Sequence, residues 1–340
     1  MKQILEELNE KYIARAPHMH DIGARVTAVD RARGSLVLPA RADWLGDPVR
    51  GLLHHGPLTV LADSACGLAV GAALGRRMPY ATLDLRMDYL RPAGPEFDVH
   101  CDAECFRLTR SVAFVRASVW QSDRDQPIAT AQATFMLSTA PGTRPTAPGD
   151  LSTPAATESP ALRTGASAAT QEEDSATREE ASSTASSGAP GWQPPAASES
   201  PLPGRVIPYV EYLGIRVAPD AARPLFRLPY QHKLIGNPWL PALHGGVIAG
   251  FAETAAILHL NQTLRGAKLP KGIDFSIDYL RSGRPEETFA NCEVVRVGSR
   301  VALVQVRCWQ QDPQRPIAIA RAHMLLAPIA GEEPATPASA

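Results

Sequence analysis

The sequence predicts an α+β protein that contains two copies of one domain, each an antiparallel sheet wrapped around a long buried helix. First, the chain repeats itself: residues 52–65, "LLHHGPLTVLADSA", align without a gap with residues 242–255, "ALHGGVIAGFAETA". Second, each copy holds one long segment that is apolar on all sides, which predicts a helix buried in the core. Third, segments of alternating apolar and polar residues follow each of these, which is typical of antiparallel strands. One buried helix followed by a run of strands favours a sheet that covers the helix.

The elements of the first copy can be placed in order. The N-terminal twenty residues, "MKQILEELNEKYIARAPHMH", lack the apolar core of a signal peptide and predict a short amphipathic helix. The buried helix begins after Pro57, a residue favoured in a first helical turn, and ends near Gly75. No segment approaches the length of a membrane-spanning helix. The predicted strands cover residues 82–90, 98–108, 112–121 and 128–138, and the corresponding helix of the second copy covers 247–264.

A change in composition separates the two copies. Residues 141–204 are rich in Ala, Ser, Thr, Pro and Gly, with almost no large aliphatic side chains, and are expected to form a disordered linker. The predicted domains are therefore 1–140, which includes the N-terminal helix, and 205–330, followed by a disordered tail at 331–340.

Charge and cysteine content narrow the classes of function. The chain has 340 residues, and its 34 Lys and Arg nearly balance its 35 Asp and Glu, so no strong field favours nucleic acid or a membrane as partner. Five cysteines are present, and Cys101-x3-Cys105 has no second pair that would complete a zinc site. We expect reduced, packed thiols in a cytoplasmic protein without a metal or cofactor.

Each apolar helix carries one acid, Asp63 in the first copy and Glu253 in the second, at equivalent positions. An ionised carboxylate among apolar residues costs several kcal/mol unless it is paired or hydrogen-bonded. A single acid of this kind is more often a structural residue than a catalytic one. Its recurrence in both copies favours a functional role.

The pattern His-Gly-Gly-x6-Asp/Glu at the start of a buried helix, followed by an Asp-x4-Tyr-Leu/Met-x-Pro strand, resembles the hotdog-fold acyl-CoA thioesterases of the phenylacetyl-CoA and 4-hydroxybenzoyl-CoA thioesterase type. The resemblance covers both copies and implies hydrolysis of an acyl-CoA substrate to free acid and CoA. Members of this family work as dimers whose active sites combine residues of both partners. The tandem chain thus resembles a dimer fused into one molecule, an intramolecular pseudo-dimer, and further association of copies stays open.

In this family the residue after the motif histidine supplies a backbone N–H for the oxyanion, and the helix acid comes from the other copy. Carried over to this sequence, one composite site pairs Asp63 with Gly245, supported by His244 and Asn237.

The other composite site pairs Glu253 with His55, beside His54. The family's hydroxyl near the acid corresponds to Thr82 in the first copy, but to Gly272 in the second, so Glu253 lacks this support. The oxyanion glycine is also replaced, by His55, whose side chain crowds the thioester. We therefore expect Asp63, Thr82, Gly245 and His244 to form the working site, and the Glu253 site to be degenerate, structural or altered in specificity.

Arg110 and Arg300 lie in turns where members of the family often contact CoA phosphates, although an isolated surface arginine is usually only solvated. Two alternatives to a thioesterase remain. A non-catalytic acyl-CoA-binding protein is disfavoured by the retained Asp63 and Thr82, and an enoyl-CoA hydratase is disfavoured because the His-Phe-Pro-Gly stretch of hotdog dehydratases is missing.

Overall fold

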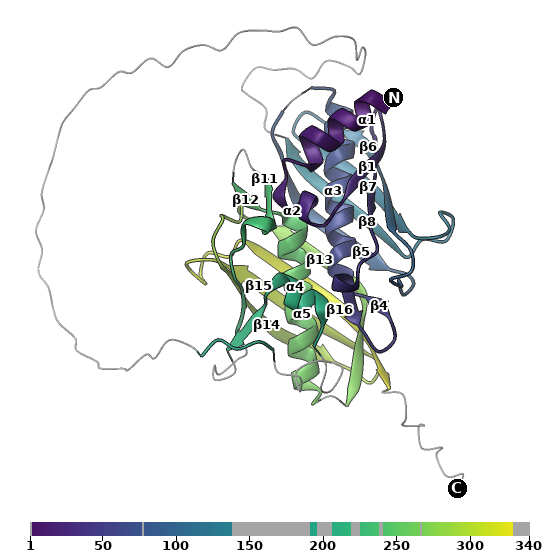
Figure 1. Cartoon of the computed structure of the whole chain (residues 1–340). Helices are drawn as coiled ribbons and strands as arrows, with labels where there is room; N and C mark the ends of the chain where they lie inside the picture. Colours follow the sequence, from purple (N-terminus) through teal and green to yellow (C-terminus); the bar gives the residue numbers. More distant parts are fainter. Residues whose placement is uncertain are drawn as a thin grey trace, which may run out of the picture.

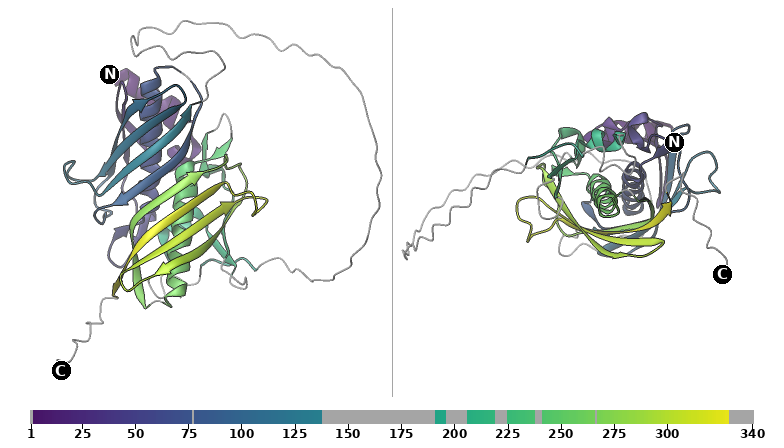
Figure 2. Two further views of the ribbon diagram at one scale, coloured as in Figure 1. Left: turned by 180° about the vertical axis from the view of Figure 1, so that it is seen from behind. Right: turned by 90° about the horizontal axis from the view of Figure 1, so that it is seen from below.

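The computed structural model describes residues 2–76, 78–137, 191–195, 206–218, 225–237, 241–265 and 267–328. One twelve-stranded antiparallel sheet curves around two long helices, α3 and α5, which lie side by side within its concave face (Figures 1 and 2). Seen end-on, shorter helical segments cover the open side of this arrangement (Figure 2). The fold is the predicted α+β pair of hotdog domains, packed as a pseudo-dimer.

From α2 in the first half and α4 in the second, the elements of the two halves follow the same order. The first half contains α1 (Lys2–Leu8), the π-helical turn η1 (Asn9–Ile13), α2 (Pro17–Asp21), β1 (Arg25–Asp30), β2 (Arg33–Leu38), the 3-10 turn η2 (Ala42–Trp44), β3 (Leu45–Asp47), β4 (Leu52–Leu53), α3 (His55–Leu74), β5 (Tyr80–Tyr89), β6 (Val99–Leu108), β7 (Val112–Trp120) and β8 (Ala129–Leu137). The second half contains α4 (Pro208–Leu213), β9 (Arg216–Ala218), β10 (Leu225–Leu228), the 3-10 turn η3 (His232–Leu234), β11 (Ile235–Asn237), β12 (Ala242–Leu243), α5 (Gly245–Thr263), β13 (Lys268–Tyr279), β14 (Thr288–Val297), β15 (Val301–Trp309) and β16 (Ala318–Pro328).

The sheet joins the halves edge to edge. Its strand order is β1-β2-β6-β7-β8-β5 from the first half, continued by β13-β16-β15-β14-β10-β9 from the second. The two central strands, β5 and β13, pair antiparallel over five residues, from Asp84↔Asp278 to Asp88↔Asp274. This pairing covers the edge that either half would otherwise expose to another chain.

Helix α3 is buried over most of its length because its side chains are almost all small or aliphatic. It begins at His55, earlier than predicted, and ends at Leu74; the next residue, Gly75, has a φ of 60°, in the left-handed region that favours glycine at a helix end. The prediction that no segment approaches membrane-spanning length is wrong for α3. It is long and apolar enough to cross a membrane, but 78% of its most apolar window is buried inside the fold.

Helices α3 and α5 approach each other closely near their N-termini. A Cβ added to Gly246 would lie 2.5 Å from the Cα of Val60, and one added to Gly250 would lie 3.2 Å from the Cα of Gly56. Both positions therefore need glycine for this contact. The two helices run antiparallel, so the N-terminus of each lies beside the acid of the other.

The linker prediction needs a correction at residues 191–195. Gln193 exchanges two backbone hydrogen bonds with Val217 of β9, at 3.0 and 2.8 Å. The ring centroids of Trp192 and Phe289 lie 5.8 Å apart, and the Arg227 guanidinium lies 4.8 Å from the centroid of the Trp192 ring. These contacts extend the second domain upstream of residue 205. The rest of the predicted linker and the predicted tail at 331–340 lie outside the described residues.

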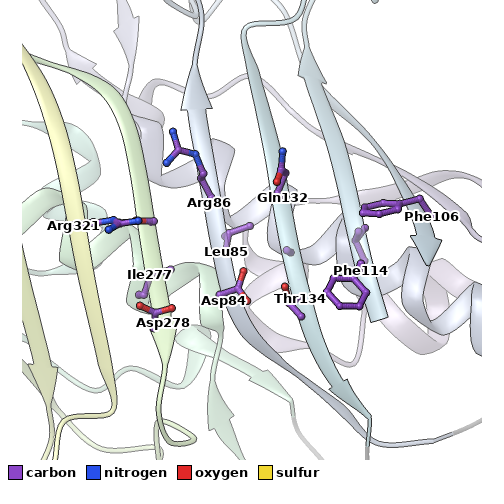
Figure 3. A pocket seen from close by; sticks show the side chains of 13 residues that line it. Asp84, Leu85, Arg86, Phe106, Phe114, Gln132, Thr134, Ile277, Asp278 and Arg321 are labelled. Atoms are coloured by element: carbon purple, nitrogen blue, oxygen red, sulfur yellow. The ribbon is translucent and has the colours of Figure 1, made fainter. Parts of the chain in front are cut away.

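A groove of about 290 Å³ opens on the convex face of the sheet, where β5 meets β13 (Figure 3). Asp84 and Asp278 face each other across this junction, and burial together with the charge of Asp278 raises the pKa of Asp84, opposed by a hydrogen bond from Thr134. The groove lies on the side of the sheet away from α3 and α5 and takes no part in the acid sites.

Candidate active site

The two motif histidines are the N-caps of the long helices. His54 and His244 have extended backbones, and their Nδ1 atoms accept from the N–H groups of Gly56 at 2.9 Å and Gly246 at 3.0 Å. An N-cap acceptor satisfies one of the free N–H groups of a first helical turn. Burial lowers the pKa of His54 to about 3, and it also lowers the pKa of His244, where the charge of Asp63 opposes it. Both imidazoles are therefore neutral near pH 7.

Each capping histidine also reaches the helix of the other half. Because Nδ1 of His244 accepts a hydrogen bond, its proton is on Nε2, which donates to Ser64 Oγ at 3.0 Å. The Ser64 hydroxyl in turn donates to the carbonyl of Val60 at 2.8 Å. The equivalent contact of the other site, between His54 Nε2 and Thr254 Oγ1, is longer at 3.4 Å. These contacts fix each helix N-terminus against the opposite helix.

The Asp63 carboxylate is held by donors from both halves. Its Oδ1 accepts from the Thr82 hydroxyl at 3.0 Å, and its Oδ2 accepts from the Gly246 N–H at 3.0 Å. The side chain is 7% exposed. The 3.5 Å distance from Oδ2 to His244 Nδ1 is not an ion pair, because that nitrogen is an acceptor of a neutral ring. The contacts keep Asp63 pointed at the N-terminus of α5.

Gly245, the first residue of α5, provides the backbone N–H at this place. Among the described residues no acceptor bonds to it, as expected for an N–H of the first helical turn. A Cβ at this position would lie 2.9 Å from Asp63 Oδ2 and 3.4 Å from the hydroxyl of Tyr279, which donates to the Gly245 carbonyl at 2.8 Å. Only glycine allows the carboxylate this approach. A free N–H and a carboxylate thus lie next to each other, one from each half.

The Glu253 site differs from the Asp63 site in its partners. Glu253 is 1% exposed, and its Oε1 atom accepts from His55 Nδ1 at 3.0 Å. Its Oε2 atom accepts from the hydroxyl of Tyr89 at 2.9 Å. The prediction that Glu253 lacks a supporting donor is therefore wrong, because an imidazole and a phenol replace the missing hydroxyl.

The side chain of His55 occupies the space that a residue larger than glycine would need at position 272. A Cβ added to Gly272 would lie 2.5 Å from Cε1 of His55 and 3.2 Å from Cδ2 of Tyr89. The imidazole also stacks on the Tyr89 ring, with 3.7 Å between centroids. The two departures of this composite site, His55 for glycine and Gly272 for threonine, therefore depend on each other sterically.

The remaining predicted residues lie outside these contacts. Asn237 is exposed at the end of β11, next to residues that are not described, so its role stays a prediction. Arg110 and Arg300 are exposed in the turns before β7 and β15. Arg110 lies at the same end of the sheet as Thr82, because the N–H of Leu137 bonds to Ser111 and Leu137 pairs with Tyr80.

Sequence reasoning missed the tyrosines that complete each site. Tyr89 and Tyr279 are equivalent residues at the ends of the central strands, yet one bonds the Glu253 carboxylate and the other the Gly245 carbonyl. Their recurrence in the Asp-x4-Tyr pattern was the available signal. Tyr209 of α4 was also missed: it is 1% exposed and stacks on His54 with 4.7 Å between centroids. His18 of α2 has the equivalent place beside His244, at 5.4 Å.

The polar groups of both sites are suited to chemistry on a carbonyl group rather than to metal binding. Within the described part of the chain, no group of three or more His, Cys, Asp or Glu side chains is placed to hold a metal ion. A free N–H at a helix N-terminus stabilises negative charge that develops on oxygen, and an adjacent carboxylate can attack or activate water.

Comparisons with known proteins relate the chain to thioesterases. The family model for the thioesterase superfamily matches both halves, at residues 50–128 and 240–317. The chain is similar to the medium/long-chain acyl-CoA thioesterase YigI of Salmonella typhimurium, with 27% identity over 150 residues that cover 40% of this chain and 95% of that protein.

Two solved structures match nearly the whole chain. Acyl-CoA thioesterase II TesB2 of Mycobacterium marinum has a TM-score of 0.52 at 11% identity, over 91% of this chain and 97% of that one. A conserved protein with hot dog fold from Alicyclobacillus acidocaldarius has a TM-score of 0.56 at 12% identity, over 93% and 98%. At these identities the structures show the fold alone.

Proposed function

The chain belongs to the thioesterase superfamily, and from this premise we propose that it hydrolyses acyl-CoA thioesters to free acid and CoA at the Asp63 site. One observation carries the proposal. The Asp63 carboxylate of the first half lies beside the free N–H of Gly245 in the second half, at the N-terminus of a long helix. We expect this activity in the cytoplasm, where acyl-CoA is the substrate and the five buried thiols stay reduced.

In the proposed reaction, the Gly245 N–H donates to the thioester carbonyl oxygen. This donor stabilises the negative charge that develops there, which is typically worth 10²- to 10³-fold in rate. His244 and Gly246 contribute indirectly, because the cap fixes the first turn of α5 and the Gly246 N–H orients the carboxylate. The Thr82 hydroxyl fixes the other carboxylate oxygen.

Asp63 can act in two ways that lead to the same products. It can attack the carbonyl carbon and expel CoA thiolate, which forms a mixed anhydride that water then hydrolyses. Alternatively, it can accept a proton from a water molecule that attacks the same carbon. Single-turnover hydrolysis in ¹⁸O-labelled water, followed by mass spectrometry of the protein and the acid, identifies direct attack when water opens the anhydride at the Asp63 carboxyl carbon, because ¹⁸O then enters Asp63 and an unlabelled Asp63 oxygen leaves with the acid. If water instead opens the anhydride at the acyl carbon, the labels match those of the water mechanism, and trapping of the anhydride with hydroxylamine distinguishes the two.

We further propose that the Glu253 site does not turn over substrate. The His55 imidazole lies against Gly272 and bonds Glu253, so a thioester carbonyl would have to displace it to reach the acid. The bond from Tyr89 engages the second carboxylate oxygen as well. Glu253 then serves to hold the halves together rather than to react.

The test is thiol release across a panel of acyl-CoAs by matched variants of the two acids. Asp63→Asn keeps the side-chain volume but removes the charge, and turnover should fall by about two orders of magnitude, the scale of general-base loss. Glu253→Gln, the matched control, should change turnover far less. If Glu253→Gln abolishes thiol release while Asp63→Asn does not, the assignment of the two sites is reversed.

Two further outcomes would replace the proposed activity. Binding of acyl-CoA measured by calorimetry, without thiol release from any member of the panel, would indicate a non-catalytic acyl-CoA-binding protein. Hydration of an enoyl-CoA without CoA release would indicate a hydratase. For the predicted CoA contacts, Arg110→Ala should raise KM more than Arg300→Ala, because Arg110 lies at the Thr82 end of the sheet.

A further inference from the structure

On the side of helix α3 that continues beyond Asp63, two of the four nearest positions are glycines. Residues three, four, seven and eight positions along a helix lie near one face, and here they are Cys66, Gly67, Val70 and Gly71. Beside Cys66 and Val70, the two glycines leave the backbone of α3 open to contact. The side chains that pack against this part of α3 therefore limit the length of any acyl group that extends along the helix from the reacting carbon.

Tyr80 of β5 fills this space one turn beyond the acid. Thr82 and Tyr80 are alternate residues of the same strand and point to the same face. The Thr82 hydroxyl meets Asp63, whereas the Tyr80 hydroxyl donates to the Gly67 carbonyl at 2.8 Å. A Cβ added to Gly71 would lie 3.1 Å from the same hydroxyl. The phenol thus crosses the gap between strand and helix about 5.4 Å, one helical turn, beyond the carboxylate.

Tyr12 of η1 closes the same space from the side of the N-terminal helix. Its hydroxyl lies 3.5 Å from the place of a Cβ on Gly67. Burial is the main cause of a raised pKa at both tyrosines, and the charge of Asp63 contributes at each. Tyr12 is held there by Asn9, whose side chain accepts from the N–H of Val26 at 2.8 Å and donates to its carbonyl at 3.0 Å.

Among the described residues, the second half has no equivalent of this arrangement. The positions that correspond to Gly67 and Gly71 hold Ile257 and Asn261, and the position of Tyr80 holds Pro270. The pair of tyrosines therefore accompanies only the acid proposed to react.

We propose that Tyr12 and Tyr80 form the end wall of the acyl-binding space of the Asp63 site and restrict the enzyme to short acyl groups. The inference rests on the proposed thioesterase activity and names the substrate class of that site. A chain much longer than a few carbons would have to displace the Tyr80 ring from its contact with α3. The tyrosines are specificity-determining residues in this proposal and take no part in the chemistry.

The experiment compares hexanoyl-CoA with dodecanoyl-CoA by thiol release. We expect the natural chain to show a kcat/KM for hexanoyl-CoA that exceeds that for dodecanoyl-CoA by at least about tenfold. Tyr80→Ala should shift this ratio toward dodecanoyl-CoA by about tenfold or more, because each methylene that gains burial is worth up to about fourfold. Tyr80→Phe, which keeps the ring, should retain the natural ratio. Gly67→Ala fits the available space and should disfavour hexanoyl-CoA relative to butyryl-CoA.

Ile257→Ala is the matched control, since it removes a side chain at the same helical position of the Glu253 half. It should leave the ratio unchanged. If Tyr80→Ala fails to fold, Tyr12→Ala tests the same wall from the half-buried side and should shift the ratio in the same direction. Equal hydrolysis of both substrates by the natural chain, or an unchanged ratio in a folded Tyr→Ala variant, would overturn the inference. Absence of thiol release from every acyl-CoA would instead overturn the proposed function.

Discussion

Replacing His55 by Gly and Gly272 by Thr together should give the Glu253 site the same residues as the Asp63 site at these two positions. The two substitutions restore the residue pair that Gly245 and Thr82 provide on the other side. They are best made in an Asp63→Asn background, because thiol release there reports on the rebuilt site.

The structure gives different expectations for the single and double changes. Gly272→Thr alone places a Cβ 2.5 Å from the His55 ring, so the imidazole must move and lose its 3.0 Å bond to Glu253. Overpacking of this kind typically costs about 1–3 kcal/mol. His55→Gly alone leaves a void, places glycine in a first helical turn and removes one donor to the buried Glu253, which together cost several kcal/mol. Together, the threonine fills part of the void, and the coupling between the two changes should be favourable by about 1 kcal/mol.

Activity is measured as thiol release with hexanoyl-CoA, and folding as the urea midpoint of each variant. Asp63→Asn alone should retain about one hundredth of the natural turnover. Adding His55→Gly and Gly272→Thr should raise this residual turnover at least about tenfold. Without the imidazole, a substrate can reach the backbone N–H of residue 55 beside the Glu253 carboxylate. Adding Glu253→Gln as well should remove the gain.

One result would refute this reasoning. If the rebuilt variant is folded, with a urea midpoint close to that of Asp63→Asn, and its turnover stays at the Asp63→Asn level, then His55 is not what keeps the Glu253 site silent.

Three further predictions follow from single contacts. Gly245→Ala places a Cβ 2.9 Å from Asp63 Oδ2, so kcat for thiol release should fall about 10²- to 10³-fold. Adding Asp63→Asn should lower kcat little further, because the two groups act together. Fully additive losses would mean that they act separately. Burial lowers the pKa of His54 to about 3, so as the pH falls below about 6.5 the unfolded chain binds a proton that the folded chain does not. His54 should therefore lower the free energy of unfolding, measured in urea, by about 2 kcal/mol between pH 6.5 and 5. His54→Asn, which keeps a cap acceptor, should reduce the total drop by that amount. An equal drop in the variant and the natural chain would contradict this prediction. Deletion within residues 145–185 should leave Tm unchanged, whereas Trp192→Ala should lower it by about 2–4 °C through lost contacts with Arg227 and Phe289; a large fall on deletion would show that the deleted residues pack.

Much of the fold was predictable because local patterns decided it. The helix that begins at His55 is apolar on every side, and such a segment needs cover on every side. The strands after it alternate clearly, and the repeat, together with the resemblance to a dimeric family, indicated that two such units pair. The strands before each buried helix were missed because β9 covers only Arg216–Ala218 and because the burial of β1 does not alternate along the strand.

The candidate site was predictable in its acids and caps, but not in its cross-contacts. Asp63 and Thr82 could be paired because their roles follow from a resemblance. That His55 would support Glu253 could not be read from the sequence, since it depends on a side-chain direction and on the absent side chain at Gly272. The wall formed by Tyr12 was equally hidden, because nothing local relates a residue in η1 to an acid in α3.

A fused pseudo-dimer can lose one site while it keeps the other, as we propose for the Glu253 site. In a dimer of identical chains, a histidine at the oxyanion position would lie in both sites, whereas here His55 lies only in the site that contains Glu253. Once the imidazole and Tyr89 donate to Glu253, the carboxylate satisfies two buried donors across the junction of the halves. Removing one partner of such a buried group costs several kcal/mol. On the proposal that Glu253 does not react, these two hydrogen bonds give a reason to keep the acid, because they link the two domains.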